Sequence, residues 1–247
     1  MRDLWQTRPK LRILYIGTGP YATLLMPLLV MGGTSALERV DLVEVNPSSA
    51  RMLQTCLDLL ELDQRRIHLY AADFMSWETP HRYDLIICEV MAAALVREPQ
   101  MAVVKKARGL LSPGGVLIPE RISLFWGLSN QNREPRWPSG MSRVPPARYQ
   151  WTHLGDLSAA ETPPTTVELE VKRAHCEGQE LTLFTEVQVY GEEVLQDAES
   201  MIVNTVCVFS DFRAYPCRLR LHYVEGPRPG WTAEPIRSGE GNCLRGK

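Results

Sequence analysis

One stretch near the start of the sequence constrains the fold of this chain more than any other. The apolar run at residues 13–16 is typical of a buried parallel strand, and it ends directly in a glycine turn at residues 17–19. The apolar segment 21–30 then has the character of a helix, and residues 40–45 have that of a second buried strand. Strand, glycine turn, helix and strand together predict a βαβ nucleotide-binding unit.

The glycines and the acid that ends the second strand indicate what such a unit holds. Glycine has no Cβ, so a ligand can approach the backbone of Gly17 and Gly19 closely. Glu44 is the candidate that accepts hydrogen bonds from both hydroxyls of a ribose. Ala22 stands where the dinucleotide fingerprint has its third glycine, and the fingerprint tolerates alanine there, so a dinucleotide stays open. A turn whose glycines only relieve backbone strain also stays open.

Composition and charge narrow the class of protein. The 247 residues suffice for one large domain or two smaller ones, and 45% apolar with 23% charged residues is ordinary for a globular chain. The net charge is -2, so no global basic field attracts nucleic acid. No signal region is recognisable, and no apolar run reaches the roughly 18 residues that a membrane span needs. We expect a soluble cytoplasmic protein that binds neither nucleic acid nor membrane.

The cysteines predict neither a disulfide framework nor a metal site. They form no CxxC pair, and several lie in apolar runs, as the positions show: Cys56, Cys88, Cys176, Cys207, Cys217 and Cys243. Buried reduced thiols are therefore expected, which agrees with a reducing cytoplasm.

The alternation of helix and strand continues past the second strand. Asn46 and Pro47 are a typical N-cap and first-turn pair, and apolar residues follow at helical spacing. Residues 67–72 have the pattern of a third strand, which Asp73 follows. This acid lies at the carboxyl edge of the predicted sheet, where it either accepts a hydrogen bond from a base amino group or caps a turn.

A fourth buried strand, residues 83–88, leads to Glu89 at the same edge, and a short apolar loop separates it from Glu98. Two carboxylates that bracket such a loop form an anionic pocket suited to a guanidinium or ammonium group. Glu98-Pro99 fits the start of the next helix equally well, because the helix dipole favours a negative charge there. Both interpretations stay open.

Taken together, these motifs resemble those of class I S-adenosylmethionine-dependent methyltransferases. Their order is Ile-Gly-Thr-Gly at 16–19, Val-Glu-Val at 43–45, Ala-Asp at 72–73, Asp-Leu-Ile-Ile-Cys-Glu at 84–89 and Leu-Ser-Pro-Gly-Gly at 111–115. More narrowly, residues 88–101 resemble the double-glutamate loop of protein arginine methyltransferases, including the separation of its two acids. Residues 115–125 resemble the segment by which those enzymes leave the nucleotide-binding domain for their β-barrel.

The resemblance implies a cofactor, S-adenosylmethionine, and a set of residues that bind it: Gly17, Thr18, Gly19, Glu44, Asp73 and Glu89. Of these, the glycines face the methionine part, Glu44 the ribose hydroxyls and Asp73 the adenine side. The implied catalytic residues are Glu89 and Glu98, which grip the nitrogen group of a guanidino- or amine-bearing substrate. A head-to-tail homodimer is also implied.

Several features of that family are not recognisable here. The helical segment with paired tyrosines that folds over the cofactor is not found before the first strand. The threonine-histidine-tryptophan loop has no match, since Thr152-His153 comes too early and His222-Tyr223 lacks the flanking pattern. Alanines replace the aromatic residues between the two acids. These departures leave a small guanidine or amine open as the substrate, besides arginine in a protein.

The second half of the chain has the alternation of half-buried strands, at residues 166–172, 181–190, 201–209 and 217–224. It predicts an antiparallel sheet or partial barrel. Residues 129–164, rich in Pro, Arg and Trp, have the character of an extended connection, arm or lid. We therefore expect a Rossmann-like, S-adenosylmethionine-binding domain over residues 1–122 and a β-rich substrate or dimerisation domain over residues 123–247.

The predicted function is direct transfer of a methyl group to a substrate nitrogen that Glu89 and Glu98 orient. A primary amine needs a base as well, which is one of these acids, His153 or His222. Four tryptophans either line a substrate cleft or only pack: Trp126, Trp137, Trp151 and Trp231. Two other functions stay open, a nicotinamide-dependent oxidoreductase built on the same βαβ unit and a catalytically silent methyltransferase-like subunit.

Overall fold

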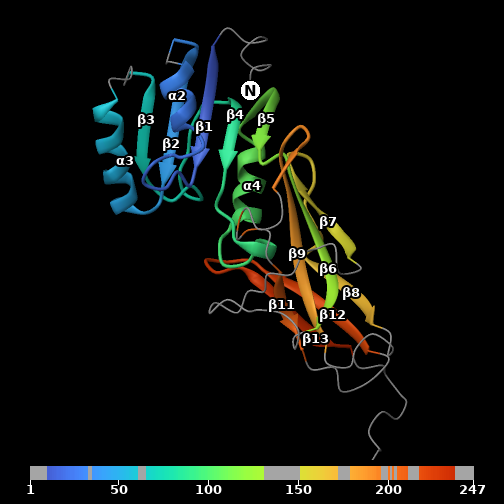
Figure 1. Cartoon of the computed structure of the whole chain (residues 1–247). Coiled ribbons are helices and arrows are strands. Elements are labelled where there is room, and N and C mark those ends of the chain that lie inside the picture. Colours follow the sequence, from blue (N-terminus) through green and yellow to red (C-terminus); the bar gives the residue numbers. More distant parts are fainter. Residues whose placement is uncertain are drawn as a thin grey trace, which may run out of the picture. The chain divides into compact units, whose positions relative to one another are not determined.

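The computed structural model describes the parts of the chain that build two compact units, namely residues 10–32, 35–60, 65–130, 151–171, 179–195, 200, 202, 205–210 and 217–236 (Figure 1). Unit 1 consists of Met1–Val90, Gln100–Glu120 and Ser158–Ala160. Unit 2 consists of Met91–Pro99, Arg121–Leu157 and Glu161–Lys247.

Unit 1 contains a parallel sheet of five strands in the order β3-β2-β1-β4-β5. The strands are β1 (Leu11–Ile16), β2 (Leu37–Glu44), β3 (Ile67–Ala71), β4 (Tyr83–Cys88) and β5 (Leu111–Ile118). The predicted Rossmann-like sheet is thus confirmed. The strand order reverses at β1, whose neighbours are β2 and β4. In open α/β sheets, ligands bind outside the carboxyl ends of the strands at such a switch point.

The helices of unit 1 are α2 (Met26–Gly32), α3 (Pro47–Leu59) and α4 (Gln100–Arg108). Leucines of α2 and α3 pack with strand residues in one buried cluster, for example Leu29 and Leu53 with Ile13. The predicted N-cap of α3 is confirmed, because the Asn46 side chain accepts hydrogen bonds from the amides of Ser48 and Ser49.

Helix α2 begins later than the apolar pattern of residues 21–30 predicts. Residues 20–25 form turns instead, with Ala22 at a φ of 45°, and the regular helix starts at Met26. Pro27 fits this start, since proline lacks an N–H and is tolerated in the first turn of a helix. Ala22 and Leu25 are nevertheless fully buried, so apolar spacing predicted the buried side chains but not the backbone conformation.

Unit 2 is built from antiparallel sheets. One sheet has the order β10-β9-β6-β7, with β11 also paired to β9, and the other has the order β13-β12-β8. The strands are β6 (Arg121–Asn130), β7 (Thr152–Ser158), β8 (Thr166–Val171), β9 (Gln179–Tyr190), β10 (Glu193–Val194), β11 (Val206–Phe209), β12 (Cys217–Val224) and β13 (Gly230–Pro235). The β-rich second half predicted from alternation is confirmed.

One segment of unit 2 differs from the sequence pattern. Strand β7 lies within residues 129–164, which the composition indicates to be an extended connection. Its sequence, THLGDLS, does not alternate strictly because a glycine interrupts it, so periodicity gave no strand signal there. Residues 131–150 of that connection lie outside the described residues, as do parts of the predicted strand at 201–209.

No helix in the described part of the chain is long and apolar enough to cross a membrane. The same residues contain no group of three or more His, Cys, Asp or Glu side chains that is arranged to hold a metal ion.

Candidate functional site

The turn after β1 places Gly17, Thr18 and Gly19 at the carboxyl edge of the unit 1 sheet. Gly17 and Gly19 have φ values of 73° and 59°, in the left-handed region that favours glycine. The Gly17 N–H donates to the Val43 carbonyl at 2.9 Å, which ties the turn to β2. A Cβ on Gly17 would lie 2.3 Å from Val90 Cγ1, whereas one on Gly19 would meet no atom of the described residues within 4 Å. The open approach to this turn is therefore at Gly19.

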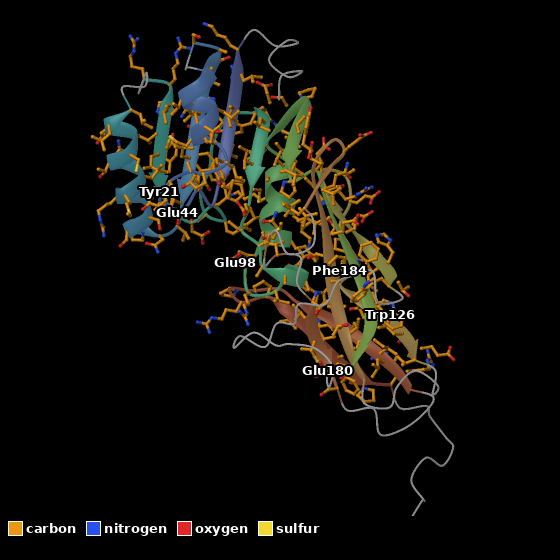
Figure 2. The ribbon with its side chains drawn as sticks, in the orientation of Figure 1. Tyr21, Glu44, Glu98, Trp126, Glu180 and Phe184 are labelled. Carbon is orange, nitrogen blue, oxygen red and sulfur yellow. The ribbon has the colours of Figure 1, made fainter. Side chains whose placement is uncertain are left out.

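Glu44, the last residue of β2, links the glycine turn to the N-cap of α3 through the two oxygens of its carboxylate. Oε2 accepts the Gly19 N–H at 2.8 Å and Oε1 accepts the Asn46 N–H at 2.7 Å. Glu44 is only 6% exposed, and such charge-assisted hydrogen bonds are what fix a buried carboxylate. Each oxygen has a further lone pair, so the group can also accept hydrogen bonds from two ligand hydroxyls. Figure 2 shows Glu44 at the edge where the strands of unit 1 end.

Asp73 follows β3 and caps a turn. Its Oδ1 accepts the Met75 N–H at 2.9 Å, and its carbonyl accepts the amides of Ser76 and Trp77 at 3.1 and 3.0 Å. Of the two interpretations of this acid, turn capping is thus confirmed. The residue is exposed at the carboxyl edge, where its role toward an adenine stays a prediction.

Glu89 follows β4, and Gln100 holds the peptide groups on both sides of it. Gln100, 0% exposed at the start of α4, donates from Nε2 to the Cys88 carbonyl at 2.9 Å. Its Oε1 accepts the Val90 N–H at 3.0 Å and the Cys88 thiol at 3.4 Å. The backbone at Glu89 is therefore fixed, whereas the side chain of Glu89 is exposed.

Two buried groups beside these acids stay neutral at physiological pH. Burial, and then the nearby charge of Glu89, raise the pKa of Tyr15 to about 12. Burial likewise raises the pKa of the Cys88 thiol to about 12. Neither group adds a charge of its own beside the carboxylate of Glu89.

Glu98 lies in unit 2, at the end of the segment Met91–Pro99, here called the acid loop. The middle of the loop is buried, since Ala94 and Leu95 are 0% exposed, whereas Glu98 itself is exposed. Glu89 belongs to unit 1 and Glu98 to unit 2, so each unit holds one of the two acids. The joint action of these acids on one substrate group stays a prediction.

Both candidate histidines of unit 2 have side-chain partners. His153 Nε2 lies 2.9 Å from Asp156 Oδ1, and His222 Nδ1 lies 3.0 Å from the Thr166 hydroxyl. Their predicted role as bases stays a prediction.

The tryptophans differ in what they contact. Trp231 is 8% exposed, and its indole N–H donates to the Ala94 carbonyl at 3.1 Å. The Trp151 ring packs on Phe184, with ring centroids 5.4 Å apart, and Trp126 is half-buried on β6. Trp137 lies outside the described residues.

Sequence reasoning missed the residues that hold the backbone at the two acids. It gave no role to Gln100 or Tyr223, and for Trp231 it left open only whether the side chain lines a cleft or packs. Tyr223 and Trp231 contact the acid loop across 128 and 137 residues of sequence, so no local pattern signals them. For Gln100 the available signal was a polar residue in an otherwise apolar helix face.

The sequence matches no protein-family model. No curated protein matches it either. Solved structures do match. PRMT1 of Trypanosoma brucei, in an enzyme–prozyme heterotetrameric complex with AdoHcy, has a TM-score of 0.62 at 14% identity, over 96% of this chain and 89% of that chain. Protein arginine methyltransferase 10 of Arabidopsis thaliana, in an open conformation, has a TM-score of 0.61 at 14% identity, over 89% and 81% of the two chains.

The fold is therefore a class I methyltransferase fold, a parallel Rossmann-like sheet followed by antiparallel sheets. More narrowly, it is the fold of the protein arginine methyltransferases, as the resemblance of the sequence motifs implies.

Proposed function

We propose that this protein is a methyltransferase that uses S-adenosylmethionine to methylate a nitrogen of a guanidino or amino group. The observation that carries the proposal is the Glu44 carboxylate bound to the amides of Gly19 and Asn46, beside the switch point of the sheet. The T. brucei neighbour supports it, because that structure is a complex with AdoHcy, the product that S-adenosylmethionine leaves after methyl transfer.

The residues of unit 1 fit such a cofactor. The open side of Gly19 admits a ligand to the backbone, and the remaining lone pairs of Glu44 match the two hydroxyls of a ribose. The other residues proposed to bind it are Gly17, Thr18, Asp73 and Glu89. When bound, S-adenosylmethionine supplies a methyl group on a sulfonium, which is an electrophilic carbon.

In the proposed reaction Glu89 and Glu98 hold the nitrogen group of the substrate. A guanidinium presents several N–H donors in a plane, and two carboxylates can accept two sets of them. The nitrogen lone pairs are delocalised, so a guanidinium is a poor nucleophile. Two carboxylates on one side of the group would concentrate charge on the attacking nitrogen and orient it toward the methyl carbon.

A primary amine makes a further demand, since it must lose a proton before it attacks the methyl carbon. Glu89, Glu98 or a histidine would accept that proton. His153 and His222 are hydrogen-bonded to Asp156 and Thr166. A guanidinium also loses one proton when its nitrogen gains the methyl group, and one of the two carboxylates would accept it.

The proposal extends to assembly and location. The T. brucei neighbour is a heterotetramer, which supports association of this chain with further subunits, and we propose a homodimer. We place the protein in the cytoplasm on the strength of its scattered cysteines alone.

The test is transfer of a labelled methyl group from S-adenosylmethionine to an arginine-containing peptide, free arginine and a primary amine. With the accepted substrate, Glu89→Gln and Glu98→Gln each lower kcat/KM about 100-fold or more, because a charged partner of the nitrogen group is lost. The controls Glu78→Gln in unit 1 and Glu192→Gln in unit 2 change exposed glutamates and leave kcat/KM within about twofold. Activity of Glu89→Gln and Glu98→Gln at the level of these controls would contradict the assigned roles.

A further inference from the structure

The backbone of the acid loop adopts conformations that its residues disfavour. Ala94, Leu95 and Arg97 have φ values of 53°, 59° and 71°, in the left-handed region that residues with a Cβ rarely occupy. Such residues persist only where the surrounding structure holds them, and they concentrate at functional sites. The loop therefore needs partners that impose its shape.

Strands β12 and β13 of the same unit supply those partners. The Trp231 indole N–H donates to the Ala94 carbonyl at 3.1 Å, and the Tyr223 hydroxyl donates to the Leu95 carbonyl at 2.8 Å. Two consecutive carbonyls, both on left-handed residues, are thus each bound by one aromatic side chain. The two rings pack on each other, with centroids 5.0 Å apart at an interplanar angle of 58°, and both residues are at least nine-tenths buried.

The conformation continues from these carbonyls to Glu98 through backbone hydrogen bonds. The Arg97 N–H donates to the Pro229 carbonyl at 2.7 Å, in the turn between β12 and β13. The Glu98 N–H donates to the Val96 carbonyl at 2.9 Å. These hydrogen bonds fix the backbone at Glu98 relative to the strands of unit 2.

We propose that Tyr223 and Trp231 are positioning residues that set the place of the Glu98 carboxylate for the methyl acceptor. This inference rests on the proposed function. Within unit 1, Gln100 fixes the backbone on both sides of Glu89. Within unit 2, the two aromatic donors fix the backbone of the loop that ends in Glu98 and Pro99. The positioning role also accounts for the alanines of the loop, because Ala94 is fully buried and a larger side chain there would displace its surroundings.

The alternative is that these aromatic residues only contribute to the stability of unit 2. The two explanations predict different effects of Tyr223→Phe on kcat/KM. If Tyr223 acts through Glu98, removing its hydroxyl lowers kcat/KM in the wild type but hardly at all in the Glu98→Gln variant. If Tyr223 acts only through stability, removing the hydroxyl lowers kcat/KM by the same factor in both backgrounds.

The experiment uses the full chain with the substitutions Tyr223→Phe, Trp231→Phe and Glu98→Gln, and with Tyr223→Phe combined with Glu98→Gln. Tyr190→Phe, on β9 of the same unit, is the control. Each variant is titrated with AdoHcy, assayed for methyl transfer, and probed by hydrogen exchange at the Arg97 and Glu98 amides. Removing a hydroxyl or indole N–H keeps a ring in place, so the variants are expected to fold.

We expect Tyr223→Phe and Trp231→Phe each to lower kcat/KM about tenfold or more, with the affinity for AdoHcy unchanged within about twofold. The Arg97 and Glu98 amides exchange faster, and Tyr223→Phe has no further effect on kcat/KM in the Glu98→Gln background. An equal loss in both backgrounds, or wild-type kcat/KM in both single variants, overturns the positioning role. A wild-type chain that neither binds AdoHcy nor transfers methyl groups overturns the proposed function itself, and the positioning role with it.

Discussion

The glycine turn after β1 and the acid loop both contain left-handed backbone, but they are held in different ways. In the turn the left-handed residues include Gly17 and Gly19, and the hydrogen bonds that fix them come from the adjacent strand β2 and its last residue. In the loop they are Ala94, Leu95 and Arg97. Side chains 137 and 128 residues further along hold the first two, and the Pro229 carbonyl holds the third. The turn is encoded by its own residues, whereas the loop takes its shape from the fold of unit 2.

The two arrangements differ in cost. Glycine adopts a positive φ without a steric penalty. A residue with a Cβ pays about 1–2 kcal/mol for the same conformation, so the loop is stable only while its partners offset that strain. The turn should therefore be sensitive to added atoms, and the loop to the removal of hydrogen bonds.

Among the residues of the glycine turn, Gly17 should be the most sensitive to an added methyl group. A Cβ there meets Val90 Cγ1 at 2.3 Å and also faces a positive φ, so Gly17→Ala should destabilise unit 1 by about 3 kcal/mol. Gly19→Ala meets no atom of the described residues within 4 Å and should cost only about 1 kcal/mol. Urea unfolding of both variants measures the difference, and equal losses would show that steric contact with Val90 is not what makes Gly17 necessary.

The next largest effect is expected at Gln100, which holds the backbone at Glu89. Gln100→Met keeps the volume of the side chain but leaves the Cys88 carbonyl and the Val90 N–H without this partner, at a cost of about 1–3 kcal/mol. Gln54→Met, on an exposed position of α3, should change the free energy of unfolding by less than about 0.5 kcal/mol. The free energies of unfolding of both variants are measured by chemical denaturation. Equal values would contradict the role of Gln100 in fixing the backbone at Glu89.

Alkaline pH should lower the free energy of unfolding, because of the buried Cys88 thiol at the end of β4. The pKa of Cys88 is raised to about 12 in the folded chain, so between the unfolded value of about 8.5 and that pH the folded state binds more protons. Stability is full below about pH 8.5 and falls above it, by about 2 kcal/mol at pH 10 from this thiol. Tyr15, whose pKa is also raised to about 12, adds to the fall above about pH 10. Cys88→Ala should flatten the loss between pH 8.5 and 10, and an unchanged slope in urea unfolding would contradict this cause.

The smallest effect tests strain in the acid loop. Ala93 and Ala94 are both buried, but they differ in backbone conformation. Ala94 has a φ of 53°, whereas the φ of Ala93 is not positive. Replacement by glycine removes one methyl group in each case, but only Ala94→Gly relieves a steric penalty. Ala94→Gly should therefore be about 1 kcal/mol more stable than Ala93→Gly. A thermal unfolding midpoint that is the same for both would mean that the left-handed residues of the loop carry no strain.

Features that depend on neighbouring residues could be predicted from the sequence. The buried strands, the cap at Asn46 and the acid at the end of β2 each depend on a few consecutive residues, so apolar runs and turn chemistry sufficed. The motifs around Glu89 and Glu98 pointed to the fold of the arginine methyltransferases for the same reason.

The structural features that could not be predicted from the sequence depend on residues that are far apart in the chain. Packing sets the hydrogen bonds of Gln100, Tyr223 and Trp231, and it also sets the late start of α2. The periodicity of apolar residues does not report such packing. Strand β7 was not predicted, because a glycine breaks its alternation of polar and apolar residues. The assignment of the two acids to different units likewise follows from contacts and not from their spacing.

We propose that Glu44 and the turn it binds hold the nucleoside part of S-adenosylmethionine. The test is calorimetric titration of AdoHcy into the wild-type chain, Glu44→Gln, Glu44→Ala and the control Glu38→Ala, an exposed acid on the same strand. We predict a Kd on the order of micromolar for the wild type and the control, weakened about 100-fold or more in both Glu44 variants. No binding to the wild type, or equal binding to Glu44→Ala, would contradict the account.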